Sequence, residues 1–417
     1  MLCITTIVSG NYLAYAKTLA DSVREWEESA EFRVLVVDRP VRAIRDAVAE
    51  LGLNATYAED LGLSDFDQLA FKYDIVELNT AVKPTHLKRL LAEGFDRVLY
   101  LDPDIHLYGP LTPVHEALDR ASIALTPHSL EPVMDGLRPS DIDFLRTGAY
   151  NLGFIGVRDS PVAKRMLDWW EKRCLSYGFN DLGFGTFVDQ KWMDLVPAYF
   201  DEVTIIKNPG CNVAYWNLHE RMLKEEDGEI QVNGMPLCFF HFSGVKADRP
   251  DNLSRHQTRH VVRRGSILAE LVTNYCGCLR RNGHDRFSKI EYTFGRFDDG
   301  EIVSSHIRRL ATFMCDEGAS PFKSGGAVGK RRYSLGSGIP KDTQSKQETT
   351  LNFSQSARKV IWANRFVRLL AKTIGIKWTA QFVRYMSVLN REANLLRVLS
   401  KTELDFAHRE NSSRRLR

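Results

Sequence analysis

The sequence predicts an α/β fold in which helices flank a sheet, followed by a C-terminal helical extension. Over the first hundred residues, short apolar runs alternate with segments that repeat apolar residues every three or four positions. Such alternation is typical of strand–helix–strand units. The runs are apolar throughout, as in parallel strands buried on both faces. Hydrophobic residues make up 44% and charged residues 26% of the 417 residues, which are ordinary globular values and exclude a wholly disordered chain.

The expected elements follow in order along the chain. A β-branched run at 2–8 is predicted as the first strand, and apolar residues at helical spacing predict a helix at 11–26. A second apolar run at 32–37 ends at an aspartate, and a helix at 40–51 follows it. The remaining predictions are helices at 83–93, 160–177 and 255–281, and strands at 97–101, 122–126, 151–157 and 238–241.

The length and the local composition predict several regions. At about 150 residues per domain, the chain holds two to three domains, or one large domain with an appendage. We expect a main α/β domain over 1–255, a helical or irregular extension over 256–319, a linker over 320–352 and a basic helical tail over 353–417. The linker is predicted because this stretch is rich in Gly, Ser, Lys and Gln and has few large apolar residues.

Membrane-spanning and targeting segments are not expected. No apolar run approaches the ~18 residues that cross a bilayer, and the N-terminal segment is predicted as a strand because it lacks a basic leader and a cleavage site. Seven cysteines in a chain of this length are sparse and odd in number, which favours a reducing cytoplasm. Only Cys276 and Cys278 stand close together, as C-x-C, so a structural zinc site is not expected.

The segment RVLYLDPDIHLY, which begins at Arg97, is the most informative in the chain. Its strand delivers Asp102 and Asp104 to the edge of the sheet, separated by one proline. Alternate residues of an extended segment point the same way, so these carboxylates can share a hard divalent cation, which prefers oxygen ligands. Asp-Pro-Asp also suits a plain turn, but its position after a buried strand favours metal binding. Two other D-x-D triplets follow no convincing buried strand and are predicted as surface or acceptor-side residues: Asp65/Asp67 and Asp141/Asp143.

A third metal ligand is expected in CFFHFSGVK, where an apolar strand ends at His241. A neutral imidazole can complete a Mn²⁺ or Mg²⁺ shell. Gly244 would let the backbone approach a phosphate, and Lys246 would supply a positive charge for it. A histidine between phenylalanines is also common in a core, but the H-x-x-G-x-K context favours a ligand. Because ligands of such sheets bind beyond the carboxyl ends of the strands, Thr6 and Asp38 are expected at the same site.

Four motifs, in this order, resemble those of the family 8-type glycosyltransferases: LYLDPDI, YNLGFIGV, VDQ and HFSGVK. These are nucleotide-sugar-dependent enzymes of the GT-A fold, and the resemblance covers about residues 1–250. It implies a Rossmann-like mixed sheet and a Mn²⁺- or Mg²⁺-dependent transfer from a UDP-sugar, with retention at the anomeric carbon. After the histidine the family usually has G-x-x-K-P-W, whereas this chain has Gly244-Val245-Lys246 followed by Ala247.

Carried over position by position, the resemblance assigns roles to nine residues. The metal ligands are Asp102, Asp104 and His241, and the diphosphate contacts are Gly244 and Lys246. Asn151 and Asp189 would hydrogen-bond the donor sugar, Gln190 would lie near the anomeric carbon, and Lys83 would lie near the donor.

The residues leave the stereochemistry open. A retaining transfer needs no strong base if the leaving phosphate oxygen takes the acceptor proton, which suits a neutral Gln190 at the reacting face. An inverting transfer would need a carboxylate base, for which Asp143 and Asp189 are candidates. The aromatic pair Tyr215 and Trp216 would form a platform for an acceptor sugar or, equally, pack in the core.

The leading hypothesis is a transferase that builds a glycan or glycolipid at the cytoplasmic membrane face. A nucleotidyltransferase of the same fold is an alternative, but the Gly-rich loop with Lys and Arg that it requires is absent between Val8 and Lys17. A non-catalytic sugar-binding or scaffold protein is a second alternative, against which the intact motif residues argue.

The tail predicts a peripheral membrane contact. Residues 353–417 contain 14 Lys or Arg and 4 Asp or Glu, so a balance of +10 is concentrated there while the whole chain carries +3. Between Phe353 and Arg391 the cations alternate with aromatic and aliphatic residues at three-to-four spacing, as in interfacial helices. A helix that packs on the main domain is the alternative. Nucleic acid is not expected as a partner, because no recognition motif accompanies the charge.

Overall fold

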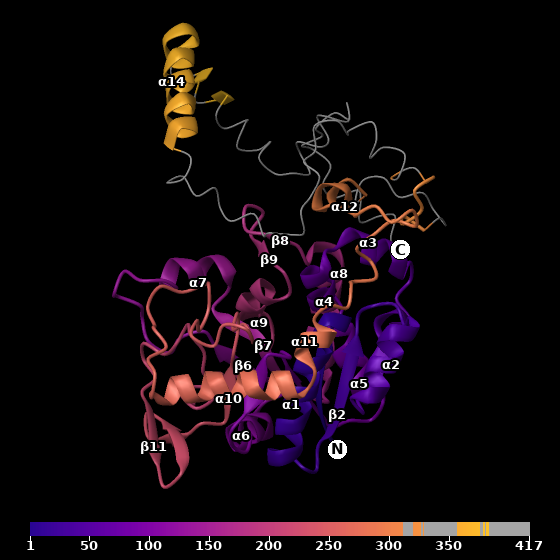
Figure 1. The fold of residues 1–417 in the computed structure, drawn as a ribbon, viewed down its shortest axis with the longest axis vertical. Helices are drawn as coiled ribbons and strands as arrows, with labels where there is room; N and C mark the ends of the chain where they lie inside the picture. The colour runs from indigo at the N-terminus through magenta and orange to yellow at the C-terminus, as the bar shows by residue number, and fades with distance from the viewer. Residues whose placement is uncertain (312–319, 327, 329–356, 376–377, 380, 383–417) are drawn as a thin grey trace. The chain divides into compact units, whose positions relative to one another are not determined.

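The computed structural model describes residues 1–311, 320–326, 328, 357–375, 378–379 and 381–382. These residues form two compact units. One comprises Met1–Leu69 and Tyr73–Phe294, and the other comprises Ala70–Lys72 and the chain from Gly295 onward. The first unit continues past residue 255 because helix α10 (Ile267–Arg281) packs against α1 (Leu13–Trp26) (Figure 1).

A seven-stranded sheet forms the centre of the first unit. Its strands, in order across the sheet, are β10 (Val203–Ile205), β6 (Ile123–Pro127), β7 (Tyr150–Arg158), β4 (Arg97–Leu101), β1 (Leu2–Val8), β2 (Glu31–Val36) and β3 (Ala55–Tyr57). All neighbours pair in parallel except β7, which is antiparallel to both β4 and β6. The predicted fold class, a mixed sheet with flanking helices, is therefore confirmed.

The helices and the small strands complete the architecture. Besides α1 and α10, the helices are α2 (Arg42–Glu50), α3 (Phe66–Lys72), α4 (Ile75–Ala81), α5 (Lys83–Ala92), α6 (Thr112–Arg120), α7 (Asp141–Thr147), α8 (Pro161–Tyr177), α9 (Val196–Tyr199), α11 (His284–Phe287), α12 (Ser305–Ala311) and α14 (Ala357–Ile374). Short 3₁₀ helices lie at Gly10–Tyr12 (η1), Ala58–Leu61 (η2) and Gln190–Leu195 (η3). The small strands are β5 (Ile105–Leu107) with β14 (Phe239–His241), β8 (Asn180–Asp181) with β9 (Thr186–Phe187), and β11 (Leu223–Glu226) with β12 (Glu229–Val232) and β13 (Met235–Pro236).

The central strands are buried along nearly their whole length, as their apolar sequences predict. In β7 only the first and last residues retain partial exposure. One cluster of buried side chains includes Leu99 and Phe154, and another includes Val34 and Ile44. Full burial of such a side chain stabilises the fold by roughly 1.5–3 kcal/mol. These clusters hold the strand ends, where the candidate site lies, on a rigid base.

The helix predicted at 255–281 begins only at Ile267, so that prediction is wrong for residues 255–266. Ser266 caps the helix, because its hydroxyl accepts a hydrogen bond from the backbone N–H of Ala269. Before this cap, the Arg259 guanidinium donates to the Asp135 carboxylate at 2.5 and 2.9 Å. This long-range pair, together with Gly265, favours an irregular path over a helix.

The structure describes only part of the C-terminal regions for which a linker and a tail are predicted. At the start of the predicted linker, Phe322 is buried and packs edge-on against Phe71, with ring centroids 4.9 Å apart. Helix α14 lies within the predicted tail. The rest of the linker and tail predictions lies outside the described residues. No helix in the described part of the chain is long and apolar enough to span a bilayer.

Candidate functional site

The candidate metal ligands Asp102, Asp104 and His241, here called the metal group, meet where β4, β5 and β14 come together. The Asp102 backbone N–H donates to the Gly153 carbonyl at 2.7 Å, and the Ile105 N–H donates back to the Asp102 carbonyl at 3.0 Å. The chain therefore turns tightly through Asp102 and Asp104 into β5. Strand β14 pairs with β5 so that His241 lies opposite Ile105. One ligand atom from each of Asp102, Asp104 and His241 lies within 4.8 Å of the others, as this predicted metal site requires.

His241 is held in one orientation by groups around its ring. Its Nε2 lies 2.9 Å from Asp104 Oδ1 and 3.8 Å from Asp102 Oδ2. Its Nδ1 lies 3.3 Å from Asn212 Oδ1, which can only accept, so the proton belongs on Nδ1 and Nε2 is available to a cation. Trp216 packs edge-on against the ring at 5.0 Å. Burial lowers the pKa of His241, but the Asp104 and Asp102 carboxylates outweigh it and raise the pKa overall.

The donor set fits a hard divalent cation such as Mn²⁺ or Mg²⁺, with two carboxylates and one imidazole converging. Tyr100 supports it by donating its hydroxyl proton to Asp102 Oδ1 at 2.6 Å. Among the described residues, this is the one group of three such ligands. Asp67 and Asp143, from the other D-x-D triplets, pair with Arg39 and Arg138 instead.

A buried ion pair lies beside the metal group. Lys83 Nζ lies 2.6 Å from Asp189 Oδ2, with both side chains at most 2% exposed. The ammonium also donates to the Leu152 carbonyl at 2.9 Å and lies 4.0 Å above the Tyr100 ring. Burial raises the pKa of Asp189, an effect that Lys83 opposes and Asp102 adds to. The pair holds the start of α5 against the start of η3, and the bond to Leu152 connects Lys83 to β7.

The two predicted amides, Asn151 and Gln190, form one buried network. Gln190 Oε1 accepts from the Leu152 N–H at 3.0 Å, and its Nε2 donates to the Thr147 carbonyl at 3.0 Å. Asn151 Oδ1 accepts from the Gly153 N–H at 3.1 Å and from Asn212 Nδ2 at 3.0 Å. The network therefore connects β7 to the metal group through Asn212.

Sequence reasoning missed Asn212, which is fully buried and has a left-handed backbone with φ of 55°. Asn212 precedes the aromatic pair Tyr215 and Trp216, in a stretch of sequence without a metal-ligand pattern. Only the contact of Asn212 with His241 shows its role. In that stretch Trp216 is buried and Tyr215 half-buried. Trp216 therefore packs in the core.

The remaining predicted donor residues differ in their surroundings. Thr6 is fully buried and its hydroxyl has no hydrogen-bond partner among the described residues. Asp38 is buried, with one oxygen accepting from the Gly10 N–H at 2.7 Å and the other from the Thr293 N–H at 2.6 Å. Gly244 has φ of 79°, and Lys246 is exposed.

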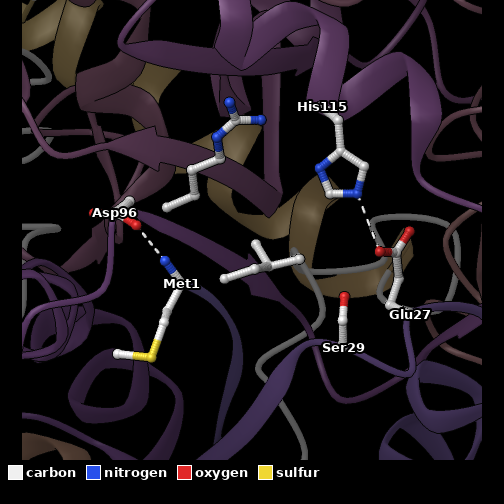
Figure 2. Close-up of a pocket in the computed structure, with 7 residues that line it drawn as sticks. Met1, Glu27, Ser29, Asp96 and His115 are labelled. Carbon is white, nitrogen blue, oxygen red and sulfur yellow. Dashed lines mark hydrogen bonds and ion pairs between the residues drawn. The ribbon is translucent and has the colours of Figure 1, made fainter.

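A cavity of about 260 Å³ lies away from this site (Figure 2). Its lining includes Leu2 and Arg97, which begin β1 and β4, so it lies at the opposite end of those strands from Asp102. Two of its polar groups, Glu27 and His115, pair with each other at 3.0 Å. None of the predicted site residues lines this cavity.

Comparison with known proteins gives distant matches. No protein-family model matches the chain. Over 246 residues the chain is 28% identical to the uncharacterized protein YfnF of Bacillus subtilis strain 168, which covers 58% of this chain and 80% of YfnF. It is 24% identical to the uncharacterized protein YfnD of the same organism, covering 58% and 76%.

Among solved structures, the galactosyltransferase LgtC, in complex with donor and acceptor sugar analogues, matches 66% of this chain and 95% of its own, with 20% identity and a TM-score of 0.39. The glycosyltransferase GlyE of Streptococcus pneumoniae TIGR4 matches 71% and 66%, with 15% identity and a TM-score of 0.39. These identities and TM-scores are low, and the functional proposal therefore rests on the residues of the site.

Replacing Gly153 with alanine is expected to disrupt the metal group. A Cβ at this position would lie 2.7 Å from His241 Nδ1 and 2.8 Å from Asn151 Oδ1, and closer still to His241 Cε1. We expect the free energy of unfolding to fall by about 1–3 kcal/mol and Mn²⁺ affinity to fall by roughly 10–100-fold. Denaturant titration and calorimetric Mn²⁺ titration would measure both. The matched control is Gly277→Ala in α10, where only the Arg281 guanidinium is near, at 3.4 Å; there alanine should stabilise by ~0.5–1 kcal/mol. Unchanged Mn²⁺ affinity in Gly153→Ala would contradict the assignment.

Proposed function

We propose that the protein is a metal-dependent glycosyltransferase that moves a sugar from a UDP-sugar to a glycan or lipid-linked acceptor, with retention of configuration. The observation that carries the proposal is the meeting, at one edge of the sheet, of the Asp102–Asp104–His241 group with the buried amides Asn151 and Gln190. The first group suits a cation that binds diphosphate, and amides suit the hydroxyl groups of a sugar.

The site residues would have separate roles in such a transfer. Asp102, Asp104 and His241 would hold Mn²⁺ or Mg²⁺, which when bound stabilises negative charge on the leaving diphosphate. Gly244 would let the diphosphate approach the backbone, and the exposed Lys246 would add a positive charge next to it. The transition state at the anomeric carbon resembles an oxocarbenium ion, as in glycoside hydrolysis.

The surroundings of the acidic residues favour retention. Asp189 is 2% exposed and faces the Lys83 ammonium, and Asp143 accepts from Arg138 and Ser140. Neither carboxylate is free to act as the base that an inverting transfer requires. In a retaining transfer the leaving phosphate oxygen can take the acceptor proton, and the neutral Gln190 amide can face the sugar.

The function is tested with the full-length protein, Mn²⁺ and a panel of UDP-sugars. We expect release of UDP from at least one donor, lost in EDTA, and a product anomer with the donor's configuration by NMR. Uridine diphosphate release in EDTA would contradict metal dependence, and an inverted anomer would contradict retention. Pyrophosphate release from UTP and a sugar 1-phosphate would indicate a nucleotidyltransferase, and donor binding without turnover would indicate a non-catalytic protein.

Replacing Gln190 with alanine is expected to lower the turnover number, by about 100-fold, with little change in donor affinity. The amide would act on charge that develops at the sugar and not on the nucleotide. The variant also loses the bonds to Leu152 and Thr147, so asparagine at 190 serves as the conservative control. Steady-state kinetics and UDP titration separate the two effects. An unchanged turnover number with weaker UDP binding would move Gln190 to a binding role.

We further propose that the basic tail holds the enzyme on the cytoplasmic membrane face. In α14, the side chains of Arg365 and Arg368 are exposed together with Phe366 and Leu369. Cations near an anionic leaflet contribute roughly 1 kcal/mol each, and apolar side chains that enter the headgroup region add a term that salt does not remove.

Removing the tail is therefore expected to abolish most binding to anionic vesicles. Co-sedimentation would compare the full-length protein with a chain that ends at Ala319, on vesicles with and without anionic lipid and over a range of salt. We expect the full-length protein to bind, less tightly at high salt, and to leave a residual fraction bound. Equal sedimentation of the two proteins would refute the tether and favour a tail that packs on the protein.

A further inference from the structure

An exposed apolar group lies at the rim of the candidate site. Met134 is 89% exposed, Ile142 64%, Leu145 70% and Val261 76%. Leu137, at 40%, lies between the first two along the chain. Exposed apolar side chains that gather on neighbouring segments mark contact surfaces, because water disfavours them. We call these five residues the rim platform.

Hydrogen bonds join the two chain segments that carry the rim platform. The Thr258 N–H donates to the Arg138 carbonyl at 3.1 Å, and the Arg138 N–H donates to the Thr258 hydroxyl at 3.1 Å. Arg259 donates to the Asp135 carboxylate and to the Leu137 carbonyl. The chain that precedes α10 consequently lies beside the loop that leads into α7 (Figure 1). The two segments that carry the rim platform are thus cross-linked to each other.

The rim platform is joined directly to the site. The Leu145 carbonyl accepts from Lys191 Nζ at 2.6 Å, next to Gln190, and the Phe144 ring stacks on His128 with centroids 5.2 Å apart. On the other segment, a Cβ built on Gly244 would lie 3.4 Å from the His256 ring. Leu145 therefore lies next to the amide network, and the chain segment that carries Val261 contacts the predicted phosphate turn through His256.

The charge around the rim platform is cationic. The segments 131–146 and 255–264 contain six arginines and four acidic residues. Two of the acidic residues, Asp135 and Asp143, are paired with Arg259 and Arg138. The other four arginines are Arg146, Arg255, Arg263 and Arg264, all exposed, and the other two acidic residues are Glu131 and Asp141, so the net charge of the two segments is positive. Exposed apolar side chains among arginines match an anionic bilayer, where apolar groups enter the headgroup region and guanidinium groups bind phosphate.

We propose that the rim platform docks the first unit on an anionic membrane surface, so that the candidate site opens toward the bilayer. This contact is separate from the one proposed for the basic tail. It deepens the proposed function, because an acceptor presented at the lipid surface would meet the site directly, and it rests on that function for the nature of the acceptor alone. The docking itself can be measured without turnover.

The first test removes the apolar side chains from the full-length chain. The variant Met134→Ser/Ile142→Ser/Leu145→Ser is compared with Val41→Ser/Val76→Ser/Met222→Ser, which loses three exposed apolar side chains elsewhere. Vesicles of phosphatidylcholine with phosphatidylglycerol are titrated into each protein. We expect the partition coefficient to fall about tenfold or more in the first variant only, since each inserted side chain adds a favourable transfer term. The tail is intact in every protein, so its contribution is constant. Equal binding of both variants and the native protein would overturn the proposal.

The second test addresses the arginines near the rim platform. It compares two double variants that change the net charge equally, one near the rim platform and one on α8. Arg263→Glu/Arg264→Glu should weaken binding to anionic vesicles several-fold more than Lys172→Glu/Arg173→Glu, which reverses two exposed cations on α8. If the two double variants lose vesicle binding equally, the assignment of the membrane contact to the rim platform is overturned.

Hydrogen–deuterium exchange gives a readout that tail binding cannot imitate. Vesicles should protect the backbone amides of 134–147 in the native protein and leave β11 and β12 unchanged. Vesicle binding without this protection would overturn the proposal. A concentration-dependent dimer would also overturn it, if the triple serine variant abolishes the dimer and leaves vesicle binding unchanged. Donor hydrolysis with Mn²⁺ is measured on every variant. If the native protein hydrolyses no donor, the proposed function fails while the docking result stands on its own.

Discussion

Replacing Asp104 with asparagine is expected to abolish turnover, with a loss of about 10³-fold or more. The asparagine keeps the size of the side chain but removes one of the two carboxylates that face His241 Nε2. Losing metal-based stabilisation of a leaving diphosphate costs several kcal/mol of transition-state free energy, and each 1.36 kcal/mol is about tenfold in rate. The measurement is the turnover number with Mn²⁺ in excess, with Mn²⁺ affinity determined in parallel.

The matched control is Asp65→Asn, in a D-x-D triplet away from the metal group. Asp65 is exposed and has φ of 54°, a backbone conformation that asparagine tolerates. This variant should retain native turnover and Mn²⁺ affinity. Circular dichroism and thermal unfolding would establish that Asp104→Asn is folded. Full activity in Asp104→Asn would remove the metal assignment, whatever the control shows.

Replacing Lys83 with methionine is expected to lower the free energy of unfolding by about 3–5 kcal/mol. The substitution leaves the Asp189 carboxylate buried without its partner, and a lone buried charge is strongly destabilising. Lys88→Met on the same helix is the matched control. Lys88 pairs with Asp168 and Glu171 but is 33% exposed, so its loss should cost at most about 1 kcal/mol. Urea unfolding followed by fluorescence would compare the two. Equal losses would contradict the buried-pair account.

The loss in the free energy of unfolding caused by Lys83→Met, called the deficit below, should depend on pH. The pKa of Asp189 is raised in the folded protein, mainly by burial, so the folded state binds a proton more readily than the unfolded state does. Stability from such a group is present at low pH and is lost as pH rises through the folded pKa. Removing Lys83 raises this pKa further, so the deficit should be largest at neutral pH and shrink on acidification. A deficit that grows on acidification would show that another group controls it.

Local patterns sufficed for the main elements of the first unit. The strand at 97–101 and the helix at 161–177 coincide with their predicted spans to within a residue, because apolar runs and helical spacing report burial directly. Asp102, Asp104 and His241 were also identifiable, since each follows or ends an apolar run and long-range pairing then brings them together.

The direction of β7 was not readable from its own residues. A strand buried on both faces is apolar throughout whether it runs parallel or antiparallel to its neighbours. The irregular path of 255–266 was also missed, because the Arg259–Asp135 pair that holds it joins residues 124 positions apart. The spacing of apolar residues in a sequence does not reveal a long-range ion pair that competes with helix formation.

The sequence by itself determined the alternation of strands and helices, the residue types of the candidate metal ligands and the concentration of basic residues near the C-terminal end. Only the tertiary structure decided that Lys83 and Asp189 neutralise each other, that Asn212 orients His241, and that Gln190 and Asn151 belong to one network. The physical reason is that composition and periodicity act over a few residues. The pKa of a buried carboxylate and the orientation of an imidazole depend on groups that the fold brings together from distant segments.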